Sequence, residues 1–260
     1  MRHILTVLLV LVFVFFSLPS RVSSQCTRST NGFVDIATIQ NNPFHAEFDA
    51  TTKDPAAPAG RRRGTMDRDS QGRVRVEYSI HKEDNQSGQN QNQEAEPHNI
   101  VICDPVGHTL VQIDVLKHSA LIYRVAPPRF LFSNASSPSQ PSLCSAKPPS
   151  FSLLDIKYED LGTQTILGLQ VHGARIVSSP KPGSYDKQPA STLTYEDWCS
   201  EDLAAVVLND TSVVREGKIV NGSHSSLSNL LRAEPDAALF QIPSGYTVSE
   251  KTMASITVSR

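Results

Sequence analysis

Strict alternation of apolar and polar residues is the feature that most limits what this chain can fold into. The pattern runs from residue 44 to residue 50, FHAEFDA, and again from residue 73 to residue 80, RVRVEYSI. Successive side chains of a strand point to opposite faces of a sheet, so this period predicts strands with one buried and one solvated face. Such strands are typical of antiparallel sheets, because parallel strands are buried on both faces and read as continuous apolar runs.

Turn signals separate the predicted strands. The segment 68–73, RDSQGR, predicts a hairpin over residues 62–80. A second hairpin is expected over residues 98–125, with turns at 104–107 and 117–118. Further strands are predicted at 163–167, 169–177, 192–199, 205–210 and 227–231, and a last alternating run follows the turn at residues 243–245.

Long helical periodicity is missing. Residues 33–39 and 235–240 each predict a short helical turn, and Pro235 stands early in its turn, where a missing N–H does no harm. The predicted fold class is therefore mainly β, with one or two short helices.

The first residues predict export. After Arg2, residues 4–16 are almost all apolar, which is shorter than the ~20 residues of a membrane span, and Pro19 ends the run. We expect a signal peptide over residues 1–24, cleaved after Ser24, and a periplasmic or secreted protein. A lipid anchor on Cys26 and an uncleaved N-terminal anchor are the alternatives.

The mature chain is predicted to be one domain, residues 25–260. Cleavage removes Arg2 and Arg21 and no acidic residue, which changes the formal net charge from −2 to −4. This balance favours neither nucleic acid nor an anionic membrane surface as a partner. Three segments poor in apolar residues, 82–97, 133–150 and 179–191, are predicted to be mobile loops.

Four cysteines are candidates for disulfides in an exported chain. They are Cys26, Cys103, Cys144 and Cys199, and the spacing does not choose among the three possible pairings. None lies in a Cys-x-x-Cys motif, so neither a redox motif nor a zinc site is indicated.

Motifs of catalysis and cofactor binding are missing from the sequence. We find no zinc-protease helix, hydrolase elbow or phosphate loop, and the histidines are scattered, so we expect no enzyme, no metal site and no cofactor. Asp67 and Asp69 resemble a paired carboxylate site for acid–base work or for calcium, but their place beside a turn favours hairpin chemistry. Six arginines between residues 61 and 75 form the only basic concentration, which is either a solvated strand face or a surface for an anionic partner.

The motifs resemble a family when taken in order. The turns at 68–73 and 104–107, the run 161–168, the segment 198–203 and the closing segment 232–246 are similar to a group of uncharacterised exported proteins of soil bacteria. That group is loosely similar to the periplasmic lipoprotein-carrier type of fold. The resemblance implies a single curved antiparallel sheet, an incomplete or half barrel, with a concave apolar face.

Two hypotheses of function follow. In the first, the concave face binds an apolar ligand, such as a lipid or acyl chain, or a partner segment. The residues expected to form this face are Phe44, Phe48, Val74, Val76, Tyr78, Val111 and, as the lining of a pocket, Trp198. In the second, an envelope interaction or scaffold protein uses the basic hairpin and the polar loops to contact the cell envelope.

Overall fold

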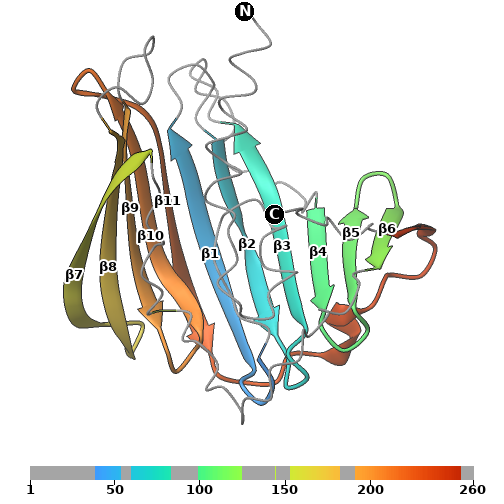
Figure 1. The fold of residues 1–260 in the computed structure, drawn as a ribbon. Coiled ribbons are helices and arrows are strands. Elements are labelled where there is room, and N and C mark those ends of the chain that lie inside the picture. The colour runs from blue at the N-terminus through green and yellow to red at the C-terminus, as the bar shows by residue number, and fades with distance from the viewer. Residues whose placement is uncertain are drawn as a thin grey trace, which may run out of the picture.

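The chain folds as a single open sheet (Figure 1). The computed structural model describes residues 39–53, 60–82, 99–124, 144, 153–181 and 191–252. Within these residues, twelve strands form one curved sheet that does not close into a barrel, with very little helix. The predicted fold class is confirmed.

The strands follow two meanders. The first contains β1 (Phe44–Lys53), β2 (Gly60–Arg68), β3 (Val74–Lys82), β4 (Asn99–Asp104), β5 (Thr109–Asp114) and β6 (Ser119–Arg124). The second contains β7 (Leu154–Ile166), β8 (Leu169–Pro180), β9 (Ser191–Ser200), β10 (Ala205–Arg215) and β11 (Lys218–Leu231). The 3-10 helix η2 (Ala237–Phe240) and the strand β12 (Thr247–Thr252) follow.

Strand β1 joins the two meanders. The order across the sheet is β12-β6-β5-β4-β3-β2-β1-β11-β10-β9-β8-β7, so β1 pairs with β2 on one side and with β11 on the other. Strands β7 and β12 are the two edges. Every neighbouring pair is antiparallel except β12 and β6, which run parallel.

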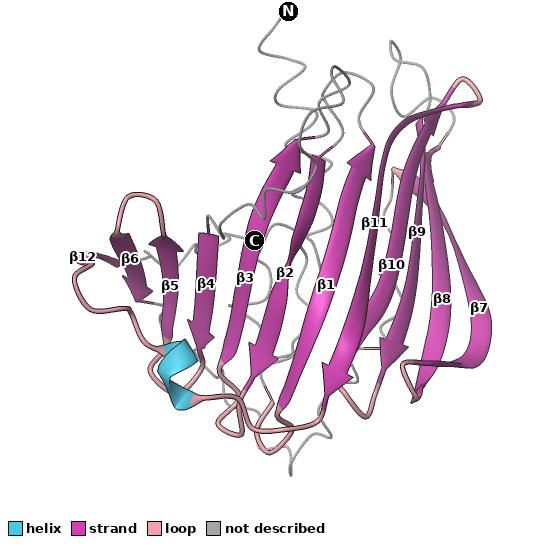
Figure 2. Ribbon diagram, turned by 180° about the vertical axis from the view of Figure 1, so that it is seen from behind, coloured by secondary structure: helices cyan, strands magenta, loops and turns pink. Residues whose placement is uncertain are grey.

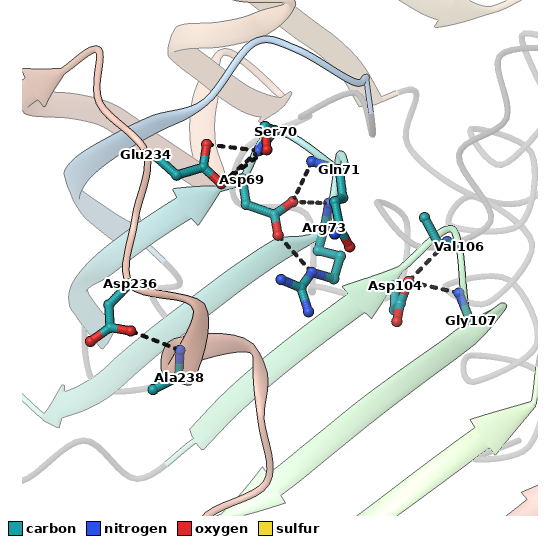
Figure 3. A network of polar contacts seen from close by, with 10 residues as sticks. All are labelled: Asp69, Ser70, Gln71, Arg73, Asp104, Val106, Gly107, Glu234, Asp236 and Ala238. Atoms are coloured by element: carbon teal, nitrogen blue, oxygen red, sulfur yellow. Dashed lines mark hydrogen bonds and ion pairs between the residues drawn. The ribbon is translucent and has the colours of Figure 1, made fainter.

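The predicted hairpin over residues 62–80 is confirmed as β2 and β3. Its turn depends on Asp69, whose carboxylate accepts hydrogen bonds from the backbone N–H groups of Gln71 and Arg73 at 3.0 and 2.8 Å and from Nε of Arg73 at 2.6 Å (Figure 3). Gly72 has φ of 82°, a conformation that glycine adopts without steric cost. Asp69 therefore has the turn role that the sequence favoured.

The two turns of the β4–β6 meander use one device. Asp104 accepts hydrogen bonds from the backbone N–H groups of Val106 and Gly107, both at 2.8 Å (Figure 3), and Asp114 accepts from that of Lys117 at 3.0 Å. Each turn ends at a histidine with positive φ, His108 at 51° and His118 at 45°. Histidine is among the residues that visit this region most often, so the repeated Asp…His spacing explains both turns.

Several predicted boundaries are wrong. Strand β7 begins nine residues before the predicted strand 163–167, and β11 begins at Lys218 rather than at residue 227, because Gly, Ser and Asn residues hide its period. Residues 179–180 and 191, predicted as loop, belong to β8 and β9. The other predicted loop residues lie outside the described part of the chain, apart from Lys82, Cys144 and Lys181.

The closing segment crosses the ends of the strands. Residues 232–246, which follow β11, are here called the strap. They run past the ends of β1 to β3 to the opposite edge of the sheet, where β12 pairs with β6 (Figures 1 and 2). Glu234 accepts hydrogen bonds from the backbone N–H and the hydroxyl of Ser70, and Asp236 caps η2 by accepting from the N–H of Ala238 at 2.9 Å (Figure 3).

The strap covers apolar side chains of the first meander. Phe240 packs into a cluster on β4, β5 and β6, and the guanidinium of Arg73 lies 4.8 Å from its ring centroid. Leu239, Ile242 and Tyr246 pack against the same cluster, which consists of Ile100, Ile102, Val111, Ile113, Ala120 and Phe240. The helical turn predicted at 235–240 is confirmed at Ala237–Phe240, whereas residues 33–38 of the other prediction lie outside the described residues. No helix in the described part is long and apolar enough to cross a membrane.

Arg68 connects three parts of the chain at the same end of the sheet. Its side chain is fully buried, donates from Nε to the carbonyl of Asn42 at 2.7 Å and from Nη2 to the carbonyl of Leu203 at 2.6 Å, and lies 4.8 Å from the ring centroid of Phe44. Burial and, to a smaller extent, the charge of Arg232 lower the pKa of Arg68 to about 10. The buried cation therefore ties the end of β2 to the start of β1 and to the β9–β10 turn.

We predict that replacing Arg68 by Lys destabilises the fold. Lysine keeps the charge but cannot reach both carbonyls with a planar fork, which leaves a buried acceptor without its hydrogen bond. We expect a loss of about 2 kcal/mol in the free energy of unfolding, measured by urea denaturation with disulfides intact. The control Arg215→Lys, at an exposed position of β10, should change it by less than ~0.5 kcal/mol. Equal effects of the two substitutions would contradict this role of Arg68.

Candidate functional site

Strand register divides the side chains between two faces. Directly paired residues of antiparallel strands share a face, so the pairs Phe48–Leu227 and Phe48–Gly64 place one set of side chains together. We call this the apolar face. Its buried part contains Phe44, Ala46, Phe48, Ala50, Met66, Val74, Val76, Tyr78, Val101, Cys103, Leu110 and Leu227. We call the other side of the sheet the charged face.

Five of the predicted ligand-binding residues lie together on the apolar face. They are Phe44, Phe48, Val74, Val76 and Tyr78, on β1 and β3, and their exposed fractions run from 0 to 8%. The structure thus brings them into one cluster, in which they act as core. Any ligand that touches them must enter from a more open part of the same face.

Val111 and Trp198 lie on the charged face. Val111 pairs with Ile102 and belongs to the cluster under the strap, so its assignment to the apolar face is corrected. Trp198 pairs with Leu208, which pairs with Ser226, which in turn pairs with Asp49. Strand parity therefore places Trp198 on the other face from the five other predicted residues, while its ring also packs against the buried cluster to which they belong.

An open patch occupies the second meander on the apolar face. One row of paired residues contains Tyr158, Ile176 and Tyr195, and the next contains Ile156, Leu193 and Val213. Together with Leu154 these seven side chains, here called the open patch, are all partly exposed, in contrast to the buried half of the face.

The sequence contained a signal for the open patch. Leu154, Ile156 and Tyr158 alternate with three charged residues, which is the pattern of a half-buried strand. The strand was nevertheless predicted to begin at residue 163, because the run follows a segment rich in Ser and Pro. The patch also requires β7, β8, β9 and β10 to pair side by side, and the sequence of a single strand does not predict that pairing.

A polar row separates the open patch from the buried half. Asn209 donates from Nδ2 to Asp197 at 2.8 Å, and Asn209 pairs in the sheet with Ser225, which pairs with Ala50. Asn209 and Ser225 are both buried. At the β7 end of the row, Nε2 of His172 lies 3.2 Å from Asp160. Polar groups are thus available beside an apolar surface, the usual composition of a ligand site.

A disulfide anchors a distant residue to the apolar face. Cys144 bonds to Cys199, with 5.3 Å between their Cα atoms, and both residues belong to the buried cluster of this face. Cys103, also on this face, is disulfide-bonded as well. Of the three pairings that four cysteines allow, the Cys144–Cys199 bridge is compatible with one.

The basic concentration on β2 and β3 is engaged within the sheet. Arg61 and Arg63 both contact the carboxylate of Asp49, Arg75 contacts Glu77, and Arg73 contacts Asp69. Arg62 lies on the apolar face 5.9 Å from the ring centroid of Tyr78, and burial lowers its pKa. The hairpin therefore presents much less net positive charge than its sequence indicates.

Acidic residues hold three of the histidines in place. Nδ1 of His45 lies 2.7 Å from the buried Asp67, His172 lies near Asp160, and Nδ1 of His224 lies 2.8 Å from Asp210. Asp67 therefore pairs with His45, while Asp69 caps the turn, and the two carboxylates do not share one site. No group of three or more residues suited to holding a metal ion occurs in the described part of the chain.

Comparisons with known proteins concern the fold alone. No protein-family model and no curated protein matches the chain. A LolA superfamily protein from Nitrosomonas europaea is similar over 78% of this chain and 92% of its own, with 12% identity and a TM-score of 0.27. The lipoprotein LppX of Mycobacterium tuberculosis is similar over 74% and 88%, with 11% identity and a TM-score of 0.28.

A third solved structure is longer than this chain. It is a chain of the MucA/MucB complex of Pseudomonas aeruginosa, with 14% identity and a TM-score of 0.36 over 78% of this chain. The match spans 56% of that chain's length. All three likenesses are loose, with identities of 11 to 14% and TM-scores of 0.27 to 0.36.

We predict that the Asp49 ion pairs stabilise the sheet at neutral pH and not in acid. Burial raises the pKa of Asp49, but hydrogen bonds from Arg61 and Arg63 more than offset this and hold it below the ordinary value of 3.8. A carboxyl group whose pKa is lower in the folded state stabilises the fold at pH values above its unfolded-state pKa. This stabilisation is lost as the pH falls through the folded-state pKa. Asp49→Asn should therefore lower the free energy of unfolding by about 0.5 kcal/mol at pH 7.

The same difference should shrink steadily below pH 3.8. Urea denaturation of both proteins across this pH range measures it, and Asp155→Asn, at an exposed position of β7, is the control. A difference between Asp49→Asn and the parent that is independent of pH would contradict the prediction.

Proposed function

We propose that this chain is an exported, non-enzymatic protein that binds a long apolar ligand, such as the acyl chain of a lipid, on the apolar face. The observation that carries the proposal is the open patch. Seven partly exposed apolar side chains on β7 to β10 continue, across the polar row, into a buried apolar cluster on β1 to β3. Contiguous exposed apolar surface on a soluble protein often marks a binding site.

The two parts of the face suit different parts of a lipid. Each methylene group that moves from water to the patch contributes about 0.8 kcal/mol, so an elongated chain gains affinity with length. Asn209, Asp197 and His172 are polar residues at the inner boundary of the patch, where the polar end of a ligand would lie. We therefore expect the ligand to lie along the strands, with its chain crossing first the row of Tyr158, Ile176 and Tyr195 and then the row of Ile156, Leu193 and Val213.

Native mass spectrometry is the first test. The mature protein is purified gently from its own envelope fraction and weighed intact, and bound molecules are then released with solvent and identified. A stoichiometric apolar adduct is the expected result. A clean apo mass, from a protein that also fails to take up an added fluorescent long-chain fatty acid, would overturn the proposal and direct the search to protein partners, as the scaffold hypothesis requires.

We predict that Ile176→Glu weakens binding of the fluorescent fatty acid by at least about tenfold. A carboxylate in the middle of the open patch must be desolvated by a bound acyl chain, and tenfold corresponds to about 1.4 kcal/mol. Leu116→Glu, at an exposed position of the β5–β6 turn, is the matched control and should bind as the parent does. Equal affinity of the Ile176→Glu protein, with a normal circular dichroism spectrum, would place the ligand elsewhere.

A further inference from the structure

The only tryptophan of the chain lies flat on a glycine shelf. A Cβ atom built on Gly173 would lie 2.6 to 2.8 Å from Cζ3, Cη2 and Cε3 of Trp198, so the six-membered ring rests directly on the backbone of β8. Gly162 of β7 pairs with Gly173, and a Cβ atom there would meet nothing within 4 Å. Toward the edge of the sheet, the position paired with Gly173 therefore carries no side chain.

Polar groups hold this ring in place. Nε1 of Trp198 donates to Oε1 of Glu196 at 3.0 Å. The other carboxylate oxygen of Glu196 accepts from Nε and Nη2 of Arg175 at 3.1 and 2.9 Å, and Nη1 of Arg175 donates to Glu159 at 2.7 Å. A partly exposed aromatic ring is thus fixed before any ligand arrives, which lowers the entropic cost of binding.

The row next to the ring is charged and open to solvent. It contains Glu159, Arg175, Glu196, Asp210 and His224, and the exposed fractions of these side chains run from 23 to 58%. The row has three carboxylates and one guanidinium. Nδ1 of His224 lies 2.8 Å from a carboxylate oxygen of Asp210. At neutral pH the row is therefore net negative, which repels acidic polymers.

From this arrangement we propose that the Trp198 shelf binds a non-acidic saccharide, of neutral or amino sugars, on the charged face. A pyranose ring has an apolar C–H face, which packs on the exposed side of an indole ring as other apolar groups do. Its hydroxyl groups donate to Glu196 and Asp210 and accept from Arg175. A protonated amino group adds attraction to the carboxylates and to the aromatic ring.

The shelf is separate from the lipid site of the proposed function. Trp198 and the open patch lie on opposite faces of the same strands, β8 and β9. Saccharide and fatty acid should therefore bind at the same time without competition. A substitution that abolishes one of these binding activities should leave the other intact.

Intrinsic fluorescence tests the proposal directly, because Trp198 is the only tryptophan. The mature protein is titrated with chitohexaose, with its deacetylated form and with an acidic oligogalacturonate. We expect a saturable change in emission with chitohexaose, at least equal affinity for the deacetylated form, and no saturation with the acidic probe. No saturable change with either non-acidic probe, or binding of the acidic probe alone, would overturn the proposal.

Calorimetric titration of variants locates the site. Trp198→Ala should weaken binding of chitohexaose at least tenfold, Trp198→Tyr should retain part of the affinity, and Glu196→Gln, which keeps one acceptor, should weaken it severalfold. Lys251→Ala on β12, at the far edge of the sheet, is the control. If Trp198→Ala does not fold, Glu196→Gln and Trp198→Tyr decide the matter, and unchanged affinity in both would overturn the assignment.

Discussion

The pairing of β1 with both β2 and β11 is the constraint on which the rest of the structure depends. Among the described residues, the β1–β11 ladder is the only antiparallel ladder that joins the strands before residue 125 to the strands after residue 152, and the parallel pair of β12 and β6 is the other ladder between these two groups. A slip of one residue on either side would turn Phe44 and Phe48 toward the charged face. Arg68 opposes such a slip, because its two carbonyl acceptors lie on different parts of the chain and fix the end of β1.

One sheet with two different faces produces the division of roles that we propose. The apolar face is buried over β1 to β3 and partly exposed over β7 to β10, whereas the charged face is covered over β4 to β6 by the strap. Because the strap crosses to the far edge, the first meander is apolar on both faces at β4 and β5. The accessible apolar surface and the accessible charged surface are therefore both on the second meander, on opposite faces of β8 and β9.

Much of the fold was predictable because it depends on local sequence patterns. The hairpin at residues 62–80 and the meander of β4 to β6 follow from alternation and from Asp and Gly at fixed positions in the turns, which act over a few residues. The five buried candidates on β1 and β3 share one face, since each strand shows its own apolar side, and their contact with a ligand stays a prediction. Trp198 was grouped with them, although Leu193 and Tyr195 on the same strand have the opposite parity to it.

Alternation, turn chemistry and cysteine number together determined the strand content, the hairpins and the presence of one apolar side on each strand. Only the tertiary structure decided which sides face the same way, that Cys144 pairs with Cys199, that β12 runs parallel to β6, and that Trp198 lies on Gly173. The physical reason is range. Side-chain parity within a strand is fixed by the backbone, whereas parity between strands depends on register and on bulges, such as those at Asp160/Gly162 and Val206/Leu208, which exist only once the strands are paired.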